Sequence, residues 1–403
     1  MRPPRSAFPA YLAGLGSWFI PLGVQGVLFP WLVAVVLHMD AFAVGIAQVA
    51  LMAPSLLFLP LGGLVADRGN PRRLLIRYHL AYAVPPFVLA LIVWLGHASY
   101  PVLIVYGLAA GSIGAFAIPT RDGLLPSIVK GNLSRAVALT TAMQMIGQLV
   151  GIAIASTADR FGAVPLLAMN GCLVLVGAIA VARLPDPPPH PPVEHPSYWH
   201  SIVEGIAEAA RSQAMWPVLL LNAGIGVFYV GPFLAVIPLV IRDIYAGSAA
   251  ELAYVNLGFW AGSIAAAMAL AAIAKGVTLR GRLVVLAVSV GAVILAAMAL
   301  YPPFLALTGL CFIWGLGAGI TLTQSRTVVQ IEAPPTHRAR LMSLFQLGIG
   351  GGGPIGAFLS GTIASVWGLK AALVAPAAAM VLLIGIVLAG SRIWTMRTVE
   401  KTV

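Results

Sequence analysis

An uncharged stretch at residues 78–120 reads YHLAYAVPPFVLALIVWLGHASYPVLIVYGLAAGSIGAFAIPT. Its 43 residues include no Asp, Glu, Lys or Arg, and the segment Gly96–Pro101 interrupts the apolar pattern near the middle. A helix needs about 20 apolar residues to cross a bilayer, so this stretch is long enough for two such helices. A second uncharged stretch of 43 residues, 283–325, has the same form, with Tyr301–Pro303 as its interruption. Each stretch therefore predicts a pair of membrane helices.

Eight shorter uncharged stretches, each long enough for one membrane helix, are 6–39, 41–66, 136–158, 161–182, 212–241, 252–274, 341–369 and 371–391. Together with the two pairs they predict an all-α polytopic membrane protein with twelve transmembrane helices. The composition agrees, because 60% of the 403 residues are hydrophobic and 9% are charged, against about 25% charged in ordinary soluble domains. These proportions exclude a soluble enzyme, a disordered chain and a nucleic-acid-binding protein.

An internal repeat divides the chain into two similar halves. The two paired stretches begin 205 residues apart, and the same offset relates Arg121 to Arg326 and Arg135 to Arg340. Repeats of this length indicate duplicated structural units, and two parallel six-helix halves are a known plan of transporters. We therefore expect two pseudo-symmetric six-helix bundles, at residues 1–184 and 213–403.

Residues 185–212 are expected to form a linker between the bundles. Seven prolines lie between residues 185 and 196, which favours an extended segment. Residues 198–211 follow with apolar side chains on one helical face and charged ones on another. This pattern predicts an amphipathic helix that lies on the cytoplasmic membrane interface.

Lys and Arg gather on one side of the predicted membrane. With the N-terminus on that side, it holds 20 of the 23 basic residues, whereas Arg160, Arg242 and Lys370 fall on the other. Cytoplasmic loops carry such an excess, so both termini are predicted to be cytoplasmic. The net charge of +11 follows largely from this bias, and we expect no nucleic-acid partner.

The loop between the second and third predicted helices carries a motif. It comprises Gly63, Asp67 and Arg68, followed by the basic pair Arg72 and Arg73. Gly63 allows close helix packing, and Asp67 can face the positive N-terminal end of a helix in the other half, for which the segment after Pro334-Pro335 is the candidate. This arrangement predicts a latch that closes the cytoplasmic side; an ordinary positively charged turn is the alternative.

This loop resembles the hallmark of the major facilitator superfamily, Gly-x-x-x-Asp-Arg followed by a basic pair, although Pro71 stands where an Arg is usual. Residues 118–126 and 338–346 resemble the exporter branch that includes the enterobactin efflux proteins. The resemblance implies a secondary transporter in the bacterial inner membrane that exports its substrate by alternating access, and proton antiport is implied by it alone. Within the first segment, Arg121 and Asp122 either pair with the loop cations or are solvated charges at a helix end.

Glycines on the fifth and eleventh predicted helices are expected to provide close packing. They are Gly147, Gly151, Gly352, Gly353 and Gly356.

Polar side chains inside the predicted spans are the default functional candidates. No Asp, Glu, Lys or Arg lies near the midpoint of any span. The resemblance implies that the first, fourth, seventh and tenth helices line the transport cavity. This makes Gln25, Asn222, Tyr229 and Trp314 the candidate lining residues. Hydrogen bonds or packing between helices remain an equal explanation for each.

His79 is either a proton relay or a satisfied polar residue near the cytoplasmic end.

This uncharged interior favours a hydrophobic or amphiphilic small-molecule substrate, because a charged metabolite usually needs a buried counter-charge. We therefore expect a monomeric exporter in contact with membrane lipids, which is not an enzyme and has no cofactor and no metal site; protons remain open as the coupling ion. A lysophospholipid or lipid flippase of the same architecture is the alternative. A membrane-embedded enzyme and a channel are more remote, because neither a nucleophile–base set nor a selectivity ring is evident.

Overall fold

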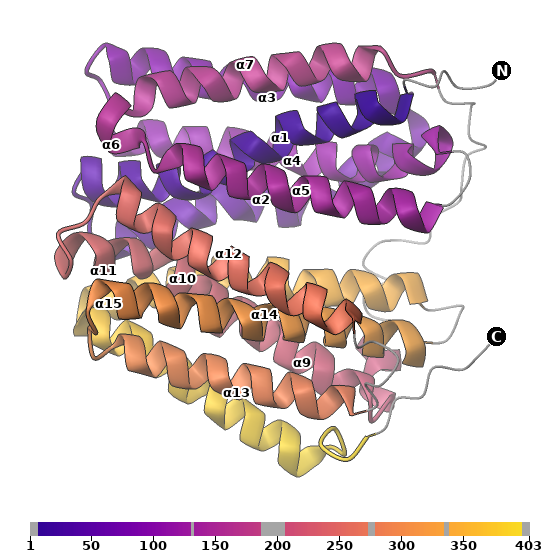
Figure 1. Cartoon of the computed structure of the whole chain (residues 1–403), viewed down its shortest axis with the longest axis vertical. Helices are drawn as coiled ribbons and strands as arrows, with labels where there is room; N and C mark the ends of the chain where they lie inside the picture. The colour runs from indigo at the N-terminus through magenta and orange to yellow at the C-terminus, as the bar shows by residue number, and fades with distance from the viewer. Residues whose placement is uncertain (1–6, 130–132, 187–205, 273–278, 334–337, 397–403) are drawn as a thin grey trace. The chain divides into compact units, whose positions relative to one another are not determined.

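The computed structural model describes residues 7–129, 133–186, 206–272, 279–333 and 338–396. These residues are almost entirely helical and include no β-strand, as the fold prediction requires (Figure 1). They divide into two compact units, the first within residues 1–39, 50–194 and 247–253 and the second within 40–49, 195–246 and 254–403. Each unit is described by itself below.

The first unit is built from the N-terminal helices. They are α1 (Ala7–Trp31), the π-helical turn η1 (Leu32–Val36), most of α2 (Ala41–Arg68), α3 (Pro71–Trp94), α4 (Tyr100–Ile128), α5 (Leu133–Ala155), α6 (Ala158–Phe161) and α7 (Ala163–Ala182). α1 packs against α5 and α7, and α3 packs against α7 and α4.

The second unit is built from the C-terminal helices. They are α9 (Met215–Ile225), the π-helical turn η2 (Gly226–Val230), α10 (Gly231–Ala235), α11 (Ile237–Asp243), most of α12 (Ala249–Ala272), α13 (Arg280–Met298), α14 (Phe304–Glu332) and α15 (Arg338–Gly390). α15 packs against α9, η2, α10 and α13.

Ten helices among the described residues are long and apolar enough to cross a membrane. One of them, within α15, contains two helices, because Gly368 has a φ of 82° that breaks the helical path and that only glycine adopts without strain. The apolar part of α5, Leu139–Ala155, is a shorter membrane candidate. Counting both parts of α15 and α5, the described residues match the twelve predicted segments; the cytoplasmic position of both termini stays a prediction.

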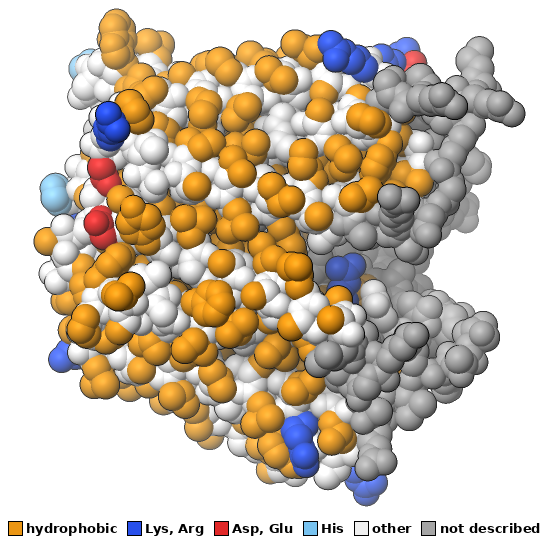
Figure 2. Space-filling view, viewed as in Figure 1, with side chains coloured by type: hydrophobic (Ala, Val, Ile, Leu, Met, Phe, Trp, Pro, Cys, Tyr) orange, Lys and Arg blue, Asp and Glu red, His pale blue; other side chains and the backbone are white. Residues whose placement is uncertain are grey.

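The surface of the helices fits a lipid environment. Hydrophobic side chains are spread over the whole of the described face in Figure 2, and Lys and Arg appear mainly near its margins. Trp94 at the end of α3 exposes 70% of its surface, and Leu305 at the start of α14 exposes 84%. Such side chains would be costly in water, so the protein is a multi-pass integral membrane protein.

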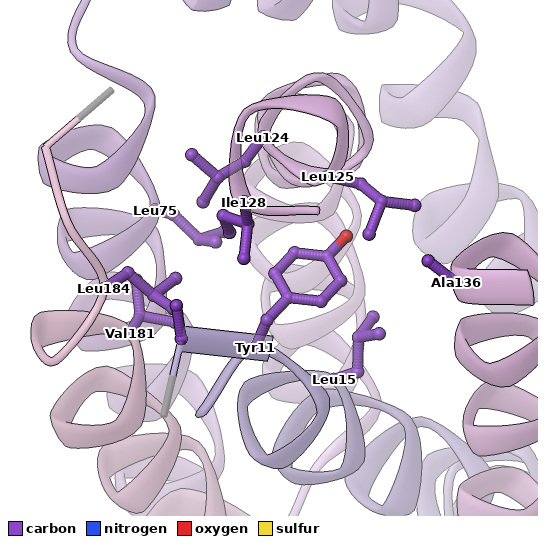
Figure 3. Close-up of a cluster of buried hydrophobic side chains, with 10 residues drawn as sticks. Tyr11, Leu15, Leu75, Leu124, Leu125, Ile128, Ala136, Val181 and Leu184 are labelled. Carbon is purple, nitrogen blue, oxygen red and sulfur yellow. The ribbon is translucent and has the colours of Figure 1, made fainter. Parts of the chain in front are cut away.

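One hydrophobic core of the first unit surrounds Tyr11 (Figure 3). The side chains labelled with it come from α1, α3, α4, α5 and α7, and Leu184 follows the end of α7. They are Leu15, Leu75, Leu124, Leu125, Ile128, Ala136, Val181 and Leu184. The Tyr11 hydroxyl donates to the backbone carbonyl of Arg121 (3.1 Å), which joins the start of α1 to α4.

Glycines allow the closest helix contacts in both units. A Cβ on Gly151 of α5 would lie 2.1 Å from the Ile20 carbonyl oxygen of α1, and one on Gly147 would lie 3.1 Å from the Phe19 side chain. In the second unit, a Cβ on Gly356 would lie 2.1 Å from the Val227 carbonyl oxygen. Helix backbones approach this closely only where no side chain intervenes.

The remaining predicted packing glycines lie in the same part of α15. A Cβ on Gly352 would lie 2.7 Å from the Cα of Gly226 at the start of η2. Gly353 is buried. The π-helical turn η2 thus begins where α15 presents its glycines.

The first nine residues of α2, 41–49, which begin with its first turn, belong to the second unit, although the rest of α2 belongs to the first. A Cβ on Gly45 would lie 2.7 Å from the carbonyl oxygen of Ala357, and the rings of Phe42 and Phe358 meet edge to face at 5.9 Å. Asp40 caps this turn by accepting a hydrogen bond from the amide of Ala43 (2.8 Å).

The first turn of α12 shows the reverse arrangement, because residues 247–253 belong to the first unit. The Asp159 carboxylate of α6 accepts hydrogen bonds from the Ser248 hydroxyl and from the amides of Ala249 (3.2 Å) and Ala250 (2.9 Å). It thereby satisfies free N–H groups at the positive end of the helix dipole. Trp31 also donates to the Ser248 hydroxyl (2.8 Å).

The predicted linker, residues 185–212, lies mostly outside the described residues. Residues 206–211 are helical, and the boundaries predicted for the two bundles stay predictions.

Candidate functional site

The first unit holds a buried polar cluster on α1 and α3. The Tyr82 hydroxyl donates to Gln25 Oε1 (2.8 Å), and the amide nitrogen of Gln25 is buried without a hydrogen-bond partner among the described residues. The Trp18 ring lies against Tyr82, with ring centroids 4.5 Å apart. Gln25 therefore makes the helix–helix hydrogen bond that the sequence left open as its alternative role.

His79 on α3 extends this cluster toward α4 and α7. Its ring meets Trp18 edge to face at 5.1 Å, and its Nδ1 lies 2.8 Å from the Leu75 carbonyl oxygen one turn earlier. His79 Nε2 is buried without a hydrogen-bond partner among the described residues. The ring borders a small cavity that is also lined by Tyr11 and Arg121.

The second unit holds an aromatic cluster, Tyr229 on η2, Phe233 on α10, Phe259 on α12 and Trp314 on α14. The rings of Phe233 and Phe259 lie 4.7 Å apart, and Trp314 meets Tyr229, Phe233 and Phe259 edge to face at 5.7–5.8 Å. Tyr229 and Trp314 are buried, whereas Phe233 and Phe259 are partly exposed. The structure thus brings two of the predicted lining residues together.

Phe233 and Phe259 are not among the lining residues predicted from the sequence. Phe233 follows Tyr229 by four residues, a spacing that places both on one helical face and could have identified it. No signal of this kind identifies Phe259, because its neighbours in the cluster lie on other helices.

Asn222 on α9 lies apart from these rings in the same unit. Its Nδ2 donates to the Phe345 carbonyl of α15 (2.7 Å), and its Oδ1 is buried without a partner among the described residues. Asn222 therefore also joins two helices, and it keeps one acceptor free.

The loop between α2 and α3 is tied to the end of α7. Asn70 caps α3 by accepting from the Arg73 amide (3.1 Å), and its Nδ2 donates to Asp186 (3.0 Å). Arg72 pairs with Asp186 (3.1 Å) and donates to the Ala182 carbonyl. The Asn70 amide and the Arg72 guanidinium hold the pKa of Asp186 below its usual range.

The contact on which the predicted latch depends lies outside the described residues, although Gly63, Arg68, Arg72 and Arg73 are described. Gly63 has open space around it, and Arg68 and Arg73 are exposed. The Asp67 side chain is not among those described, nor is the segment after Pro334-Pro335 that was expected to face it.

Arg121 and Asp122 at the inner end of α4 pair with each other, with Arg121 Nε 3.0 Å from Asp122 Oδ1. The Arg121 guanidinium also lies 5.0 Å from the centroid of the Phe19 ring. Asp122 is exposed.

The described interior holds few charges. Of the side chains described, no Asp, Glu or Lys is buried, and Arg280 at the start of α13 is the one buried Arg, with its NH1 donating to Gln324 (2.9 Å). Within the same residues, no three His, Cys, Asp or Glu side chains gather as a metal site would require. The chemistry that the interior offers is therefore binding through apolar surface, aromatic rings and neutral hydrogen bonds.

The sequence matches the family model of the Major Facilitator Superfamily over residues 8–336. Macrolide efflux protein A of Streptococcus pyogenes is 23% identical over 232 residues, which are 55% of this chain and 56% of that protein. The chain thus matches about half the length of this relative. Multidrug efflux pump Tap of Mycolicibacterium fortuitum is 26% identical over 401 residues, covering 93% of this chain and 92% of the pump.

Solved structures share the fold at low sequence identity. A peptide transporter POT in complex with sulfate superimposes with a TM-score of 0.76 and 14% identity over 98% of this chain and 96% of that one. Nucleoside transporter NupG gives a TM-score of 0.73 and 13% identity over 96% and 99%. A bacterial homologue of the human lysosomal transporter Spinster gives 0.72 and 14% over 97% and 98%.

Proposed function

Because the chain belongs to the Major Facilitator Superfamily, we propose that it exports hydrophobic or amphiphilic small molecules across the bacterial plasma membrane by alternating access. The observation that carries the proposal is the aromatic cluster of Tyr229, Phe233, Phe259 and Trp314. The efflux proteins to which the chain is similar support the direction of transport. The protein acts as a monomer without a cofactor.

The aromatic cluster favours an apolar or flat substrate. Ring faces bind apolar groups by dispersion and stacking, and each aromatic contact adds about 0.5–1.5 kcal/mol to the area that it buries. Phe233 and Phe259, the partly exposed members, would make first contact with a substrate, and the buried Trp314 holds both rings in place.

Charge supports the same substrate class. A strongly anionic or cationic metabolite held inside a membrane protein needs a buried partner of opposite charge. Among the described side chains no acid is buried, and Arg280, the buried cation, lies at a helix end with a neutral Gln324 as its hydrogen-bond partner. Binding therefore relies on apolar contact and on ring faces, which also accommodate a flat cation whose charge is delocalised over an aromatic system.

Whole-cell efflux tests the proposal. Cells that lack their main drug exporters are loaded with ethidium or erythromycin, and retention is compared with and without expression of this chain. We expect expression to lower retention. Phe233→Ala should restore most of it, because a lost aromatic contact weakens binding by up to about tenfold. Trp94→Ala, which removes an exposed ring on α3, is the matched control and should export normally.

A flippase would give a different result. If neither probe is exported, and purified protein in liposomes moves a fluorescent lysophospholipid between leaflets, the lipid alternative replaces the export of drugs. Rapid, uncoupled flux of small ions would instead favour a channel.

A further inference from the structure

Proton coupling requires a group that exchanges a proton near neutral pH. The buried ionisable side chains among the described residues are Tyr11, Tyr82, Tyr106, Tyr229, Cys311, Arg280 and His79. Phenols and thiols ordinarily titrate at about pH 10 and 8.5, and guanidinium stays charged above pH 12. Of these side-chain types, imidazole has the ordinary pKa that lies nearest to neutral pH, about 6.5.

The hydrogen bonds of His79 fix where a proton can bind. Its Nδ1 lies 2.8 Å from the Leu75 carbonyl oxygen, and only a protonated nitrogen donates to a carbonyl, so Nδ1 carries the hydrogen. Nε2 then holds a free lone pair. It is buried in a side chain that is 2% exposed and has no hydrogen-bond partner among the described residues. A bare buried acceptor costs stability, so a purely structural role leaves it unexplained.

A small cavity lies beside the His79 ring. His79 borders a space about the size of a water molecule, which Tyr11, Trp18, Leu75, Arg121 and Val181 also line. Figure 3 shows the apolar side of this region, with Tyr11 lying among Leu15, Leu75 and Val181. Arg121, which borders the same space, pairs with exposed Asp122 on α4.

The charged and titratable groups around the ring come from three helices. Arg121 faces the cavity from α4, Tyr11 from α1, and Tyr82 lies one turn along α3, where it donates to Gln25. α7 presents Gly177 and Val181, which carry no charge. An imidazolium at His79 and the Arg121 guanidinium are like charges that border one space, so a bound proton and this cation compete for it.

From these observations we propose that His79 takes up and releases the proton that drives export, with Nε2 as the binding atom and Arg121 as the group that competes with the proton. The inference rests on the proposed function, since only a coupled transporter needs such a group. Gly14 of α1 lines the same cavity, and its backbone carbonyl can accept a hydrogen bond from the protonated Nε2. Exchange of one proton at Nε2 leaves the Nδ1 hydrogen bond to Leu75 in place, so the ring can change charge without losing its anchor.

Proton release on substrate binding provides the test. Purified protein in unbuffered detergent solution is mixed with ethidium, and a pH indicator reports released protons while ethidium fluorescence reports binding. His79→Asn keeps a nitrogen donor for the Leu75 carbonyl and removes the basic ring. His97→Asn, in the exposed turn after α3, is the control. We expect wild type and His97→Asn to release protons, and His79→Asn to bind ethidium but release none.

Proteoliposomes add a second readout. A pH gradient should drive ethidium accumulation by wild type and His97→Asn, whereas His79→Asn should exchange ethidium without responding to the gradient. Proton release or gradient-driven accumulation by His79→Asn equal to wild type would overturn the inference. Wild-type transport that does not respond to the pH gradient would also overturn the inference, but it would not contradict the proposed export.

Two further outcomes are distinguishable. If wild type neither binds nor exchanges ethidium, the proposed function fails, and the role of His79 fails with it. If His79→Asn does not fold, ¹⁵N-histidine NMR of wild type decides: the His79 ring must change protonation when ethidium is added, and a ring that keeps one state refutes the inference.

Discussion

At the scale of single residues, the structure is constrained mainly by space between helices. Gly151 lets α5 reach the backbone of α1, and a Cβ there would meet the Ile20 carbonyl at 2.1 Å. Gly26, on α1 in the same unit, has nothing within 4 Å of its Cβ position. The two glycines therefore have opposite tolerances to one added methyl group.

Gly151→Ala should lower the free energy of unfolding by about 1–3 kcal/mol, because the added carbon overlaps a backbone that cannot move aside cheaply. Gly26→Ala should be neutral or gain up to about 1 kcal/mol, as expected for a glycine replaced within a helix. Thermal unfolding in detergent, followed by size-exclusion chromatography, compares the two. Equal melting temperatures would show that α1 and α5 separate more readily than the structure implies.

Asp67→Asn should abolish most export while leaving membrane insertion and folding intact, because it removes the charge that the predicted latch needs and keeps the side-chain volume. Asp243→Asn, which neutralises an exposed acid at the end of α11, is the control. Efflux of ethidium is normalised to the amount of folded protein in the membrane. Wild-type efflux by Asp67→Asn would refute the latch.

The sequence shows which positions inside the spans are polar, but it does not show which groups these side chains contact. Gln25 and Asn222 stand out in sequence because they interrupt apolar spans, and both are buried. Their partners, Tyr82 and the Phe345 carbonyl, lie 57 and 123 residues away. The rotation of one helix against another decides such pairs, and a single sequence carries no record of it.

At the scale of elements, charges were the best guide to helix number. An Arg, Lys, Asp or Glu is costly in the bilayer, so charged residues mark the ends of spans whatever the packing. The division of α15 at Gly368 was likewise foreseeable, because Lys370 separates two uncharged stretches. The π-helical turn η2 was not, since it forms beside the glycines of α15 and its own residues give no distinct signal.

Asn70→Ala should destabilise α3 by about 1 kcal/mol, because it removes the oxygen that caps the Arg73 amide. Asn70→Ser, which keeps a capping oxygen, should lose only part of this. Hydrogen exchange at the first amides of α3 reports the change directly. Equal exchange in the two variants would assign the stability of this turn to Pro71 instead.

The contact of Asp186 with Asn70 and Arg72 should be sensitive to acid. Because these partners lower the pKa of the folded-state carboxyl, the contact contributes fully above the unfolded value of about 3.9 and is lost as pH falls through the lowered folded value. Melting temperatures measured from pH 6 to 3 should therefore fall less steeply for Asp186→Asn than for wild type. Parallel curves would contradict the assignment.

At the scale of the whole molecule, the 205-residue repeat predicted two bundles, and contacts divide the described residues into two units. The sequence did not reveal that residues 40–49 and 247–253 join the opposite units. That assignment depends on contacts such as Asp159 with the first turn of α12, about 90 residues away. The internal repeat shows only that the two halves are alike in sequence, so it carries no information about such contacts.

Asp159→Asn should loosen the start of α12 by about 1 kcal/mol, because a neutral amide pairs less well with the free N–H groups and the helix dipole. Faster hydrogen exchange at residues 247–253, with the rest of α12 unchanged, is the expected result. Asp243→Asn, an exposed acid beside Arg242 at the end of α11, should leave exchange there unaltered. If hydrogen exchange at residues 247–253 is unchanged in both variants, Trp31 and Glu251, which also bond to Ser248, hold the start of α12 instead.

The shared helices limit how the transporter can cycle. The start of α2 and the start of α12 are each assigned to a different unit from the rest of the helix. If export proceeds by the proposed alternating access, α2 near Ala50 and α12 near Tyr254 are therefore the places where we expect these helices to bend. A covalent restraint across residues 250–254 of α12 would then slow turnover, although these residues lie outside the proposed aromatic binding cluster.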